Sequence, residues 1–176
     1  MLPALLLMAQ TMPAKPIDAF EATLNAHESA TLALSQWCQE RKIAPDARIS
    51  ATLVKGEDAL PAPDLSDTLG TDDPGYRHVR LSCGGHVLSE AHNWYNPSLL
   101  TPEMNHLLAT TDTPFGKVVA ALNFHREQLG SRRGPLPGCP AQTILANRAL
   151  LRLPDGRALA LVLECYTPAN LGTKAR

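Results

Sequence analysis

The sequence predicts an α+β fold with a mainly antiparallel β-sheet. Asp155-Gly156 joins two apolar runs near the C-terminus, and Gly84-Gly85 joins two strand-like runs in the middle of the chain. Such dipeptides between apolar runs are the strongest short-range signal for a β-hairpin. The helical patterns are grouped between these hairpins, whereas a parallel sheet would need them to alternate with single strands. We therefore expect helices packed on an antiparallel sheet.

Length and composition indicate one globular domain. The chain has 176 residues, of which 44% are hydrophobic and 19% charged, and this length is sufficient for a single core. We expect the domain to span residues 17–176, after an apolar leader or tail at residues 1–16. The formal charge of −1 gives no indication of a nucleic-acid partner. No apolar stretch is long enough for stable insertion into a membrane.

Residues 1–10 resemble the apolar core of a signal peptide, with a small residue near a possible cleavage site. The positively charged segment that normally precedes such a core is missing. Two alternatives stay open. The protein is periplasmic or otherwise exported if this segment is a leader, and cytoplasmic with a loosely docked tail if it is not.

Turn signals and apolar spacing divide the rest of the chain into elements. Asp18 and Glu21 form a possible capping box, and apolar residues at helical spacing extend this helix to about residue 41. Thr101-Pro102-Glu103 and Thr113-Pro114 begin two shorter helices. The expected strands are residues 48–54, 76–83, 86–95, 123–133, 143–153 and 158–167, with loops at 55–74 and 134–140.

The four cysteines contain no C-x-x-C pair, so neither a zinc motif nor a redox motif is predicted. Cys38, Cys83 and Cys165 lie in expected helices or strands, where a cysteine most simply packs as a small apolar residue. Cys139 lies in a loop rich in Pro and Gly, where it could be exposed. The disulfide state of the four stays open.

Glu164 is a single carboxylate inside the apolar run that ends the chain. Strand alternation places it on one face with Ala160 and Val162, while Leu163 and Cys165 occupy the other face. An acid among apolar side chains needs a partner or a shifted pKa when it is buried. We consider two readings: a Glu at a strand end that faces water, and a buried acid in a ligand pocket.

Basic and polar residues recur in the expected strands. An Arg side chain is the natural partner of a carboxylate ligand, because its guanidinium offers two parallel donors. Arg126 and Arg132 have the same parity, so a regular strand would direct both to one face. A single Arg in such a position is more often a solvated surface residue or the partner of a Glu than a ligand clamp. The set comprises His78, Arg80, His92, Asn93, Arg126, Arg132, Arg133 and Arg148.

Several function classes lack their motifs in this sequence. It contains no Gly-rich phosphate loop, no G-x-S-x-G elbow, no H-E-x-x-H and no EF-hand loop. His78, His86 and His92 do not have the spacing of a local metal-ligand pair, so no metal site is predicted.

An ordered series of short motifs resembles the chorismate pyruvate-lyase family, and more distantly the UTRA ligand-binding domains of transcriptional regulators. The resemblance covers residues 76–171. Its landmarks are residues 90–97 (EAHNWYNP), Thr113-Pro114-Phe115-Gly116, residues 123–127 (NFHRE), and the last hairpin with Leu150-Leu151-Arg152, Glu164 and Pro168. It implies an antiparallel sheet with packed helices and an internal ligand pocket.

The resemblance also implies an activity, the elimination of pyruvate from chorismate to give 4-hydroxybenzoate without metal or cofactor. Glu164 matches the family's catalytic Glu, which acts at the hydroxyl end of the ring. Asn93 stands where the family has an Arg that holds the ring carboxylate, and Phe115 replaces a Leu before Gly116. Where such a pair is buried, losing the charged partner of a ligand carboxylate typically weakens the binding free energy by about 2–5 kcal/mol. Either another Arg replaces the charge, with Arg126 the best candidate, or the ligand differs.

The leading functional hypothesis is therefore a lyase acting on chorismate or a related cyclic enol-ether acid, with Glu164 as the catalytic residue. Its alternative is a non-catalytic module that binds a small aromatic or cyclic carboxylate, and a purely structural role ranks last. The expected substrate-binding residues are Asn93, Arg126, Phe115, Gly116, Arg132 and Arg148.

Overall fold

A computed structural model describes residues 15–55, 60 and 65–172. Most of the apolar leader, residues 1–14, lies outside this range, so the two alternatives for it stay as stated. Within the described ranges, the structure contains no helix of the length and apolar character that a membrane crossing requires.

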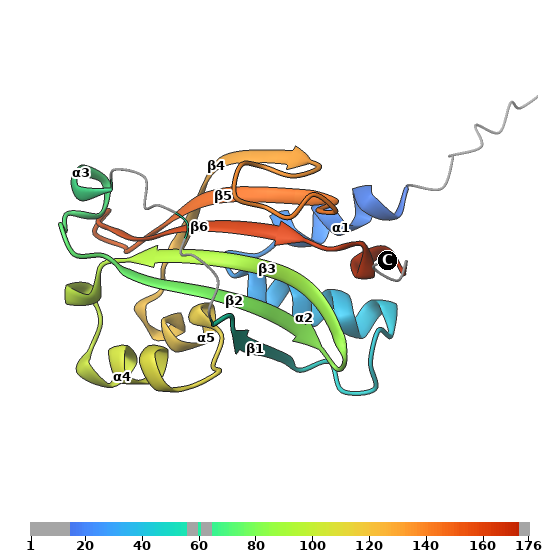
Figure 1. Cartoon of the computed structure of the whole chain (residues 1–176), viewed down its shortest axis with the longest axis horizontal. Coiled ribbons are helices and arrows are strands. Elements are labelled where there is room, and N and C mark those ends of the chain that lie inside the picture. Colours follow the sequence, from blue (N-terminus) through green and yellow to red (C-terminus); the bar gives the residue numbers. More distant parts are fainter. Residues whose placement is uncertain (1–14, 56–59, 61–64, 173–176) are drawn as a thin grey trace, which may run out of the picture.

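A six-stranded sheet forms the centre of the molecule (Figure 1). Its order is β1-β2-β3-β6-β5-β4, and all neighbours are antiparallel, as the hairpin signals predict. β3 and β6, one strand from each hairpin, are therefore the two central strands of the sheet. The strands are β1 Ile49–Leu53, β2 Gly75–Cys83, β3 His86–Tyr95, β4 His125–Arg133, β5 Leu145–Arg152 and β6 Ala158–Tyr166.

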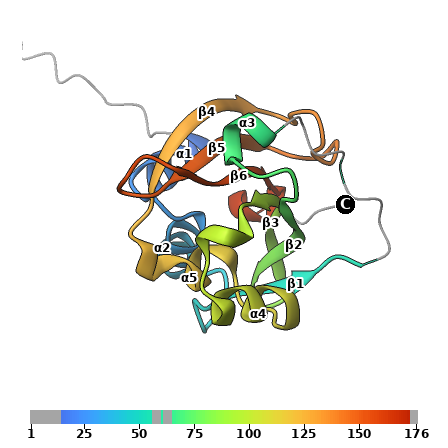
Figure 2. The same ribbon diagram turned by 90° about the vertical axis from the view of Figure 1, so that its left-hand side faces the viewer.

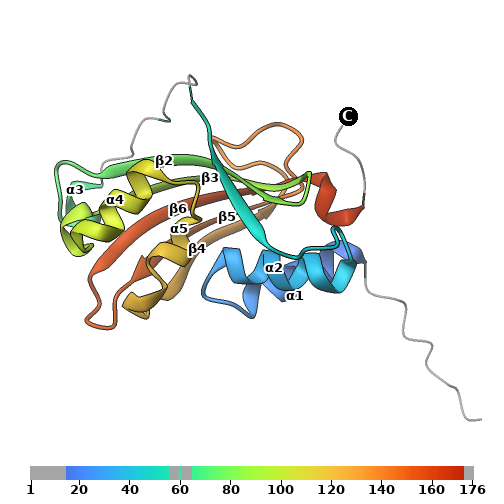
Figure 3. The same ribbon diagram turned by 90° about the horizontal axis from the view of Figure 1, so that it is seen from below.

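The longer helices pack on one face of the sheet, which we call the helix face (Figure 3). Figure 2 shows the sheet curving around α2 and α5. The helices are α1 Pro16–Asn25, α2 Ala30–Arg41, α4 Pro102–Thr110 and α5 Phe115–Val118, with α3 Ser66–Leu69 and the 3-10 turns η1 Pro97–Leu99, η2 Ala120–Leu122 and η3 Pro168–Leu171. Two core clusters result, one under α1 and α2 and one under α4 and α5. A third cluster lies on the opposite face, which we call the loop face, and includes Leu65 and Leu69.

The expected continuous helix over residues 17–41 is wrong, because the chain breaks between α1 and α2. Ser29 is extended (φ −111°, ψ 122°), so helical hydrogen bonding cannot continue through it. The break lets Phe20 of α1 pack on Trp37 of α2 and on Tyr166 of β6, with ring centroids 5.1 and 5.2 Å apart. Asp18 is not the cap: its carboxylate accepts a hydrogen bond from the Lys15 amide, one turn earlier (3.1 Å).

The cysteines form two disulfides, which corrects the expectation that they are packing residues. Cys38–Cys83 joins α2 to β2, and Cys139–Cys165 joins the loop before β5 to β6. The sequence could not indicate this pairing, because the partners are 45 and 26 residues apart and meet only when the sheet forms.

A β-bulge in β4 overturns the expectation that Arg126 and Arg132 share a face. The register between β4 and β5 shifts between Gln128 and Gly130, so one residue is inserted. Arg126 therefore pairs with Leu151, which faces the helices, whereas Arg132 pairs with Ala146 on the loop face. One extra residue in a strand reverses the faces of every residue after it.

Candidate functional site

A small cavity of about 40 Å³ lies on the helix face, between the two helix-covered core clusters. The segment joining α1 to α2, the start of α5 and the start of β4 enclose it above the sheet. Its polar lining includes Asn93, Arg126 and Glu164, which the sequence singled out. The complete lining is Glu28, Ser29, Ala30, Thr31, Val79, Leu81, Ala91, Asn93, Phe115, Gly116, Phe124, Arg126, Leu151, Val162 and Glu164.

Glu164 is a buried acid and does not face water, since only 5% of its surface is exposed. Its carboxylate accepts hydrogen bonds from both terminal nitrogens of Arg126, Nη1 to Oε1 at 3.0 Å and Nη2 to Oε2 at 2.6 Å. The Tyr166 hydroxyl donates a third, to Oε2, at 2.8 Å. A bidentate guanidinium pair of this kind is among the strongest polar contacts in proteins.

The charges at the cavity are mutually compensated. Although burial opposes its charge, Arg126 has a raised pKa because Glu164 lies against the guanidinium. Complete burial, followed by the nearby Glu164 charge, raises the pKa of the Tyr166 hydroxyl well above its ordinary value. Exposed Glu28 accepts a hydrogen bond from the Arg126 amide at the edge of the cavity. Arg126 therefore faces two acids and is not a free positive charge awaiting a ligand.

Asn93 lines the cavity from β3, and its side-chain amide makes no hydrogen bond within the described part of the chain. It is thus available to a ligand as donor and acceptor. Its register partner on β2 is Arg77, which is 3% exposed. Arg77 donates to the carbonyls of Thr113 (2.9 Å) and Thr111 (3.0 Å), and so ties the segment before α5 to the sheet. Burial lowers the pKa of the Arg77 guanidinium.

Phe115 and Gly116 begin α5 and close the cavity opposite the sheet. A Cβ atom on Gly116 would lie 2.7 Å from the Ser29 hydroxyl oxygen, so only glycine permits this approach between α5 and the start of α2. A wider cleft of about 450 Å³ adjoins the cavity and shares Glu28, Ser29 and Phe124 with it. Its volume lies in the range of small-molecule sites, whereas the inner cavity alone holds only a few water molecules.

Arg132 and Arg148 do not join this group. Both are exposed, and their register partners Ala146 and Leu163 place them on the loop face. The sequence analysis also missed two residues that support the site. Tyr166 donates a hydrogen bond to Glu164, and Arg77 binds the segment before α5. Tyr166 could have been found, because it lies two residues after Glu164 and therefore on the same face. Nothing local to Arg77 indicates its role, since its partners are 34 and 36 residues away.

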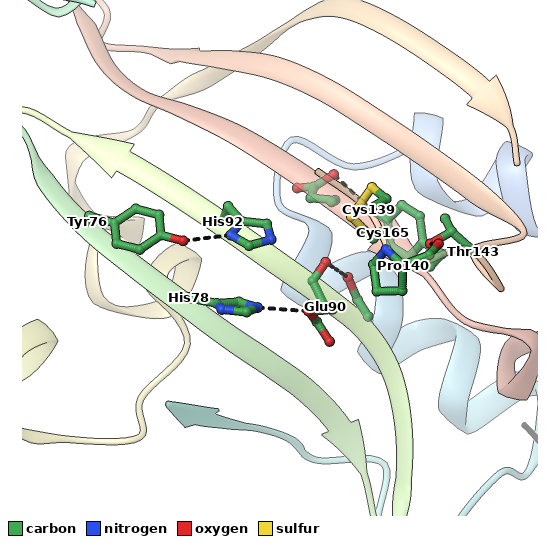
Figure 4. Close-up of a disulfide and its surroundings, with 11 residues drawn as sticks. Tyr76, His78, Glu90, His92, Cys139, Pro140, Thr143 and Cys165 are labelled. Carbon is green, nitrogen blue, oxygen red and sulfur yellow. Dashed lines mark hydrogen bonds and ion pairs between the residues drawn. A yellow bond between two sulfur atoms is a disulfide. The ribbon is translucent and has the colours of Figure 1, made fainter. Parts of the chain in front are cut away.

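A second polar cluster lies on the loop face (Figure 4). His78 and His92 are register partners on β2 and β3, and their rings stack with centroids 4.1 Å apart. Glu90 accepts hydrogen bonds from His78 (2.8 Å) and Arg80 (3.1 Å). Although burial alone would raise it, these bonds lower the pKa of Glu90. Burial lowers the pKa of His92 to about 4, so this ring is neutral at physiological pH. Sequence spacing missed this group because it forms across two strands.

The comparisons agree with this architecture. The chain is 39% identical over 189 aligned positions to the uncharacterized protein y4mC of Sinorhizobium fredii, an alignment that covers 90% of the chain and 80% of the relative. The chain belongs to the y4mC family. No protein-family model matches it.

Solved structures show where the y4mC family fits among known folds. The effector domain of PhnF from Mycobacterium smegmatis superimposes with a TM-score of 0.54 at 13% identity, covering 80% of the chain and 88% of that domain. A GntR-family transcriptional regulator from Enterococcus faecalis gives a TM-score of 0.50 at 13% identity, covering 72% and 99%. The chain spans 64% of complete PhnF. At this identity the likeness establishes the fold, which is the chorismate-lyase-like fold of UTRA domains, as the resemblance implied.

Proposed function

We propose that the chain is a binding module for a small organic molecule, which occupies the outer cleft and reaches Asn93 and the Arg126–Glu164 pair in the inner cavity. The observation that carries this proposal is the free Asn93 amide beside a buried, fully paired ion pair, at the base of a cleft of ligand size. The effector domain of PhnF shares the fold, which agrees with this role but does not identify a ligand.

The lining favours a ring compound with a polar edge. Phe115, Phe124 and Leu151 offer apolar surface, while Asn93, Arg126 and Glu164 present polar groups from the strands. A carboxylate ligand would have to share Arg126 with Glu164 and would lie near Glu28. We therefore propose that the wild-type site binds a hydroxylated ring with an uncharged polar group at least as tightly as the matching carboxylate, because Glu164 already neutralises Arg126.

A matched ligand pair tests this. 4-Hydroxybenzamide and 4-hydroxybenzoate have nearly the same shape and differ in charge. In a thermal-shift titration, a ligand at one hundred times its dissociation constant should add about 2.7 kcal/mol to the stability of the folded state. Glu164→Gln frees the Arg126 charge, so this variant should shift the preference towards the carboxylate. If no ring compound shifts the melting temperature of either protein, the binding proposal is wrong. If the preference does not change in the variant, the assigned ligand contact is wrong.

A lyase on chorismate is the second candidate function, because Glu164, the catalytic residue that the resemblance implies, lines the cavity together with Arg126. For this reaction the Glu164 carboxylate would have to replace its hydrogen bonds from Arg126 and Tyr166 with contacts to the substrate. Incubation of concentrated protein with chorismate should then give 4-hydroxybenzoate absorbance in the wild type but not in Glu164→Gln. Absence of product in both leaves the binding module alone.

A further inference from the structure

Three side chains of metal-ligating type converge on the loop face, on the side of the sheet opposite the Arg126–Glu164 cavity. His78, Glu90 and His92 each offer one ligand atom, and these atoms all lie within 4.8 Å of one another. His92 is 2% exposed and His78 8% exposed. Metal-bound donor atoms lie about 2.0–2.2 Å from the ion, so small side-chain rotations would bring the three into coordination.

The His92 ring supplies an independent observation. Its Nδ1 is hydrogen-bonded to the Tyr76 hydroxyl at 2.8 Å, which fixes the ring orientation. Its Nε2 is buried and has no hydrogen-bond partner within the described residues. In Figure 4 this nitrogen lies on the side of the ring nearer Glu90. A buried polar atom without a partner typically costs about 1–3 kcal/mol, so a missing partner is the simplest account of it.

We propose that His78, Glu90 and His92 bind a divalent transition-metal ion, for which two imidazoles and one carboxylate make Zn²⁺ the best match. Three protein ligands leave a fourth position for water or another small ligand. Tyr76 would act from outside the ligand set as a positioning residue, since it holds the His92 ring by the nitrogen that does not face the metal.

An access route and a companion charge complete the site. Glu90 lines an open cavity of about 910 Å³, so an ion can reach the carboxylate from solvent. The His78 Nε2–H group donates a hydrogen bond to Glu90 Oε1, and the ion would replace this contact. Arg80 binds Oε2 and can keep the carboxylate oriented. The neighbouring Cys165 is closed in a disulfide with Cys139, so its sulfur is not a donor in this state.

Cobalt(II) is the direct probe. Co²⁺ added to protein freed of metal by chelation should give visible d–d absorption saturating at one ion per chain, and Zn²⁺ should displace it. His78→Gln, Glu90→Gln and His92→Gln should each weaken binding at least tenfold, and Tyr76→Phe about tenfold. His86→Gln is the matched control, because this exposed histidine lines the same cavity and is outside the triad. Circular dichroism checks that each variant is folded.

A measurement on the wild type keeps the test valid if a variant does not fold. Zn²⁺ should shift the ring-nitrogen NMR signals of two of the six histidines and leave the others unchanged. The proposal is overturned if neither Co²⁺ nor Zn²⁺ binds. It is equally overturned if His86→Gln abolishes binding while the three triad variants retain it.

Discussion

Arg126 reaches across β5 to hold both carboxylate oxygens of Glu164, so β4 and β6 are linked although they are not neighbours in the sheet. The side chains are only 12% and 6% exposed. The pair therefore defines both the polar base of the cavity and a buried electrostatic tie between the edge and the centre of the sheet. The base of the cavity is therefore an electrically neutral unit.

Removing one partner of this pair should strongly destabilise the protein. Glu164→Ala leaves Arg126 as a buried charge, and Arg126→Met leaves Glu164 unpaired, so we expect each to cost about 3–5 kcal/mol in urea unfolding. The double variant should cost less than the sum of the two. Arg133→Ala is the control, because Arg133 pairs with Asp18 and Glu21 at the exposed surface and should change stability little. Single variants as mild as this control would show that the buried pair is not formed.

Gly116→Ala should destabilise the protein by about 1–3 kcal/mol and narrow the cavity, because the new methyl group would meet the Ser29 hydroxyl. Gly130→Ala provides the comparison, since a Cβ there meets nothing within 4 Å. Adding Ser29→Ala to Gly116→Ala should restore much of the lost stability by removing the oxygen. Equal melting temperatures for the two glycine variants would contradict the close approach of α5 to Ser29.

The two disulfides should contribute separately to stability. For loops closed by residues 26 and 45 apart, the chain-entropy relation gives about 3.5 and 4 kcal/mol. We expect Cys139→Ser/Cys165→Ser and Cys38→Ser/Cys83→Ser to lower the free energy of unfolding by amounts of this order. Thiol titration of the oxidised protein in denaturant should detect no free thiol before reduction. Reactive thiols at that stage would contradict the pairing.

Acid should destabilise the fold through His92. Its pKa is about 4 in the folded state and about 6.5 in the unfolded chain, so the unfolded state binds more protons between these values. The neutral His92 ring therefore contributes about 3 kcal/mol to the free energy of unfolding. This contribution is fully present above pH 6.5 and is lost as the pH falls towards 4. His78, Glu90 and Tyr76 face this ring, and Glu90, with its lowered pKa, acts in the same direction.

Urea unfolding between pH 7 and 4, with chelator present, measures this dependence. The loss of stability should be smaller in His92→Gln than in the wild type, because the variant lacks the titrating group. The same pH profile in both proteins would place His92 in contact with solvent. His86→Gln is the matched substitution control, because His86 is exposed and lies outside the His78–Glu90–His92 group.

Local patterns predicted the strands and the site acid well. Asp155-Gly156 and Gly84-Gly85 located both central hairpins, and alternation around Glu164 placed it on the face with Ala160 and Val162, which is buried against the helices. These features depend only on turn geometry and on the two-residue period of a strand. The same logic failed for the first helix. The helical spacing of side chains continues through residues 26–29, although the helical backbone ends at Asn25 and begins again at Ala30.

Tertiary structure alone decided which side chains meet. The bulge before Gly130 moved Arg132 to the face opposite Arg126, a change that no local pattern at either Arg indicates. The pairing of β2 with β3 brought His92 against His78.

The sequence by itself thus determined the antiparallel hairpins and the burial of Glu164, because both follow from contacts within a turn or a single strand. The partnership of Glu164 with Arg126, the disulfides and the histidine cluster follow from register between segments far apart in the chain. That register is fixed only when the whole sheet packs against its helices.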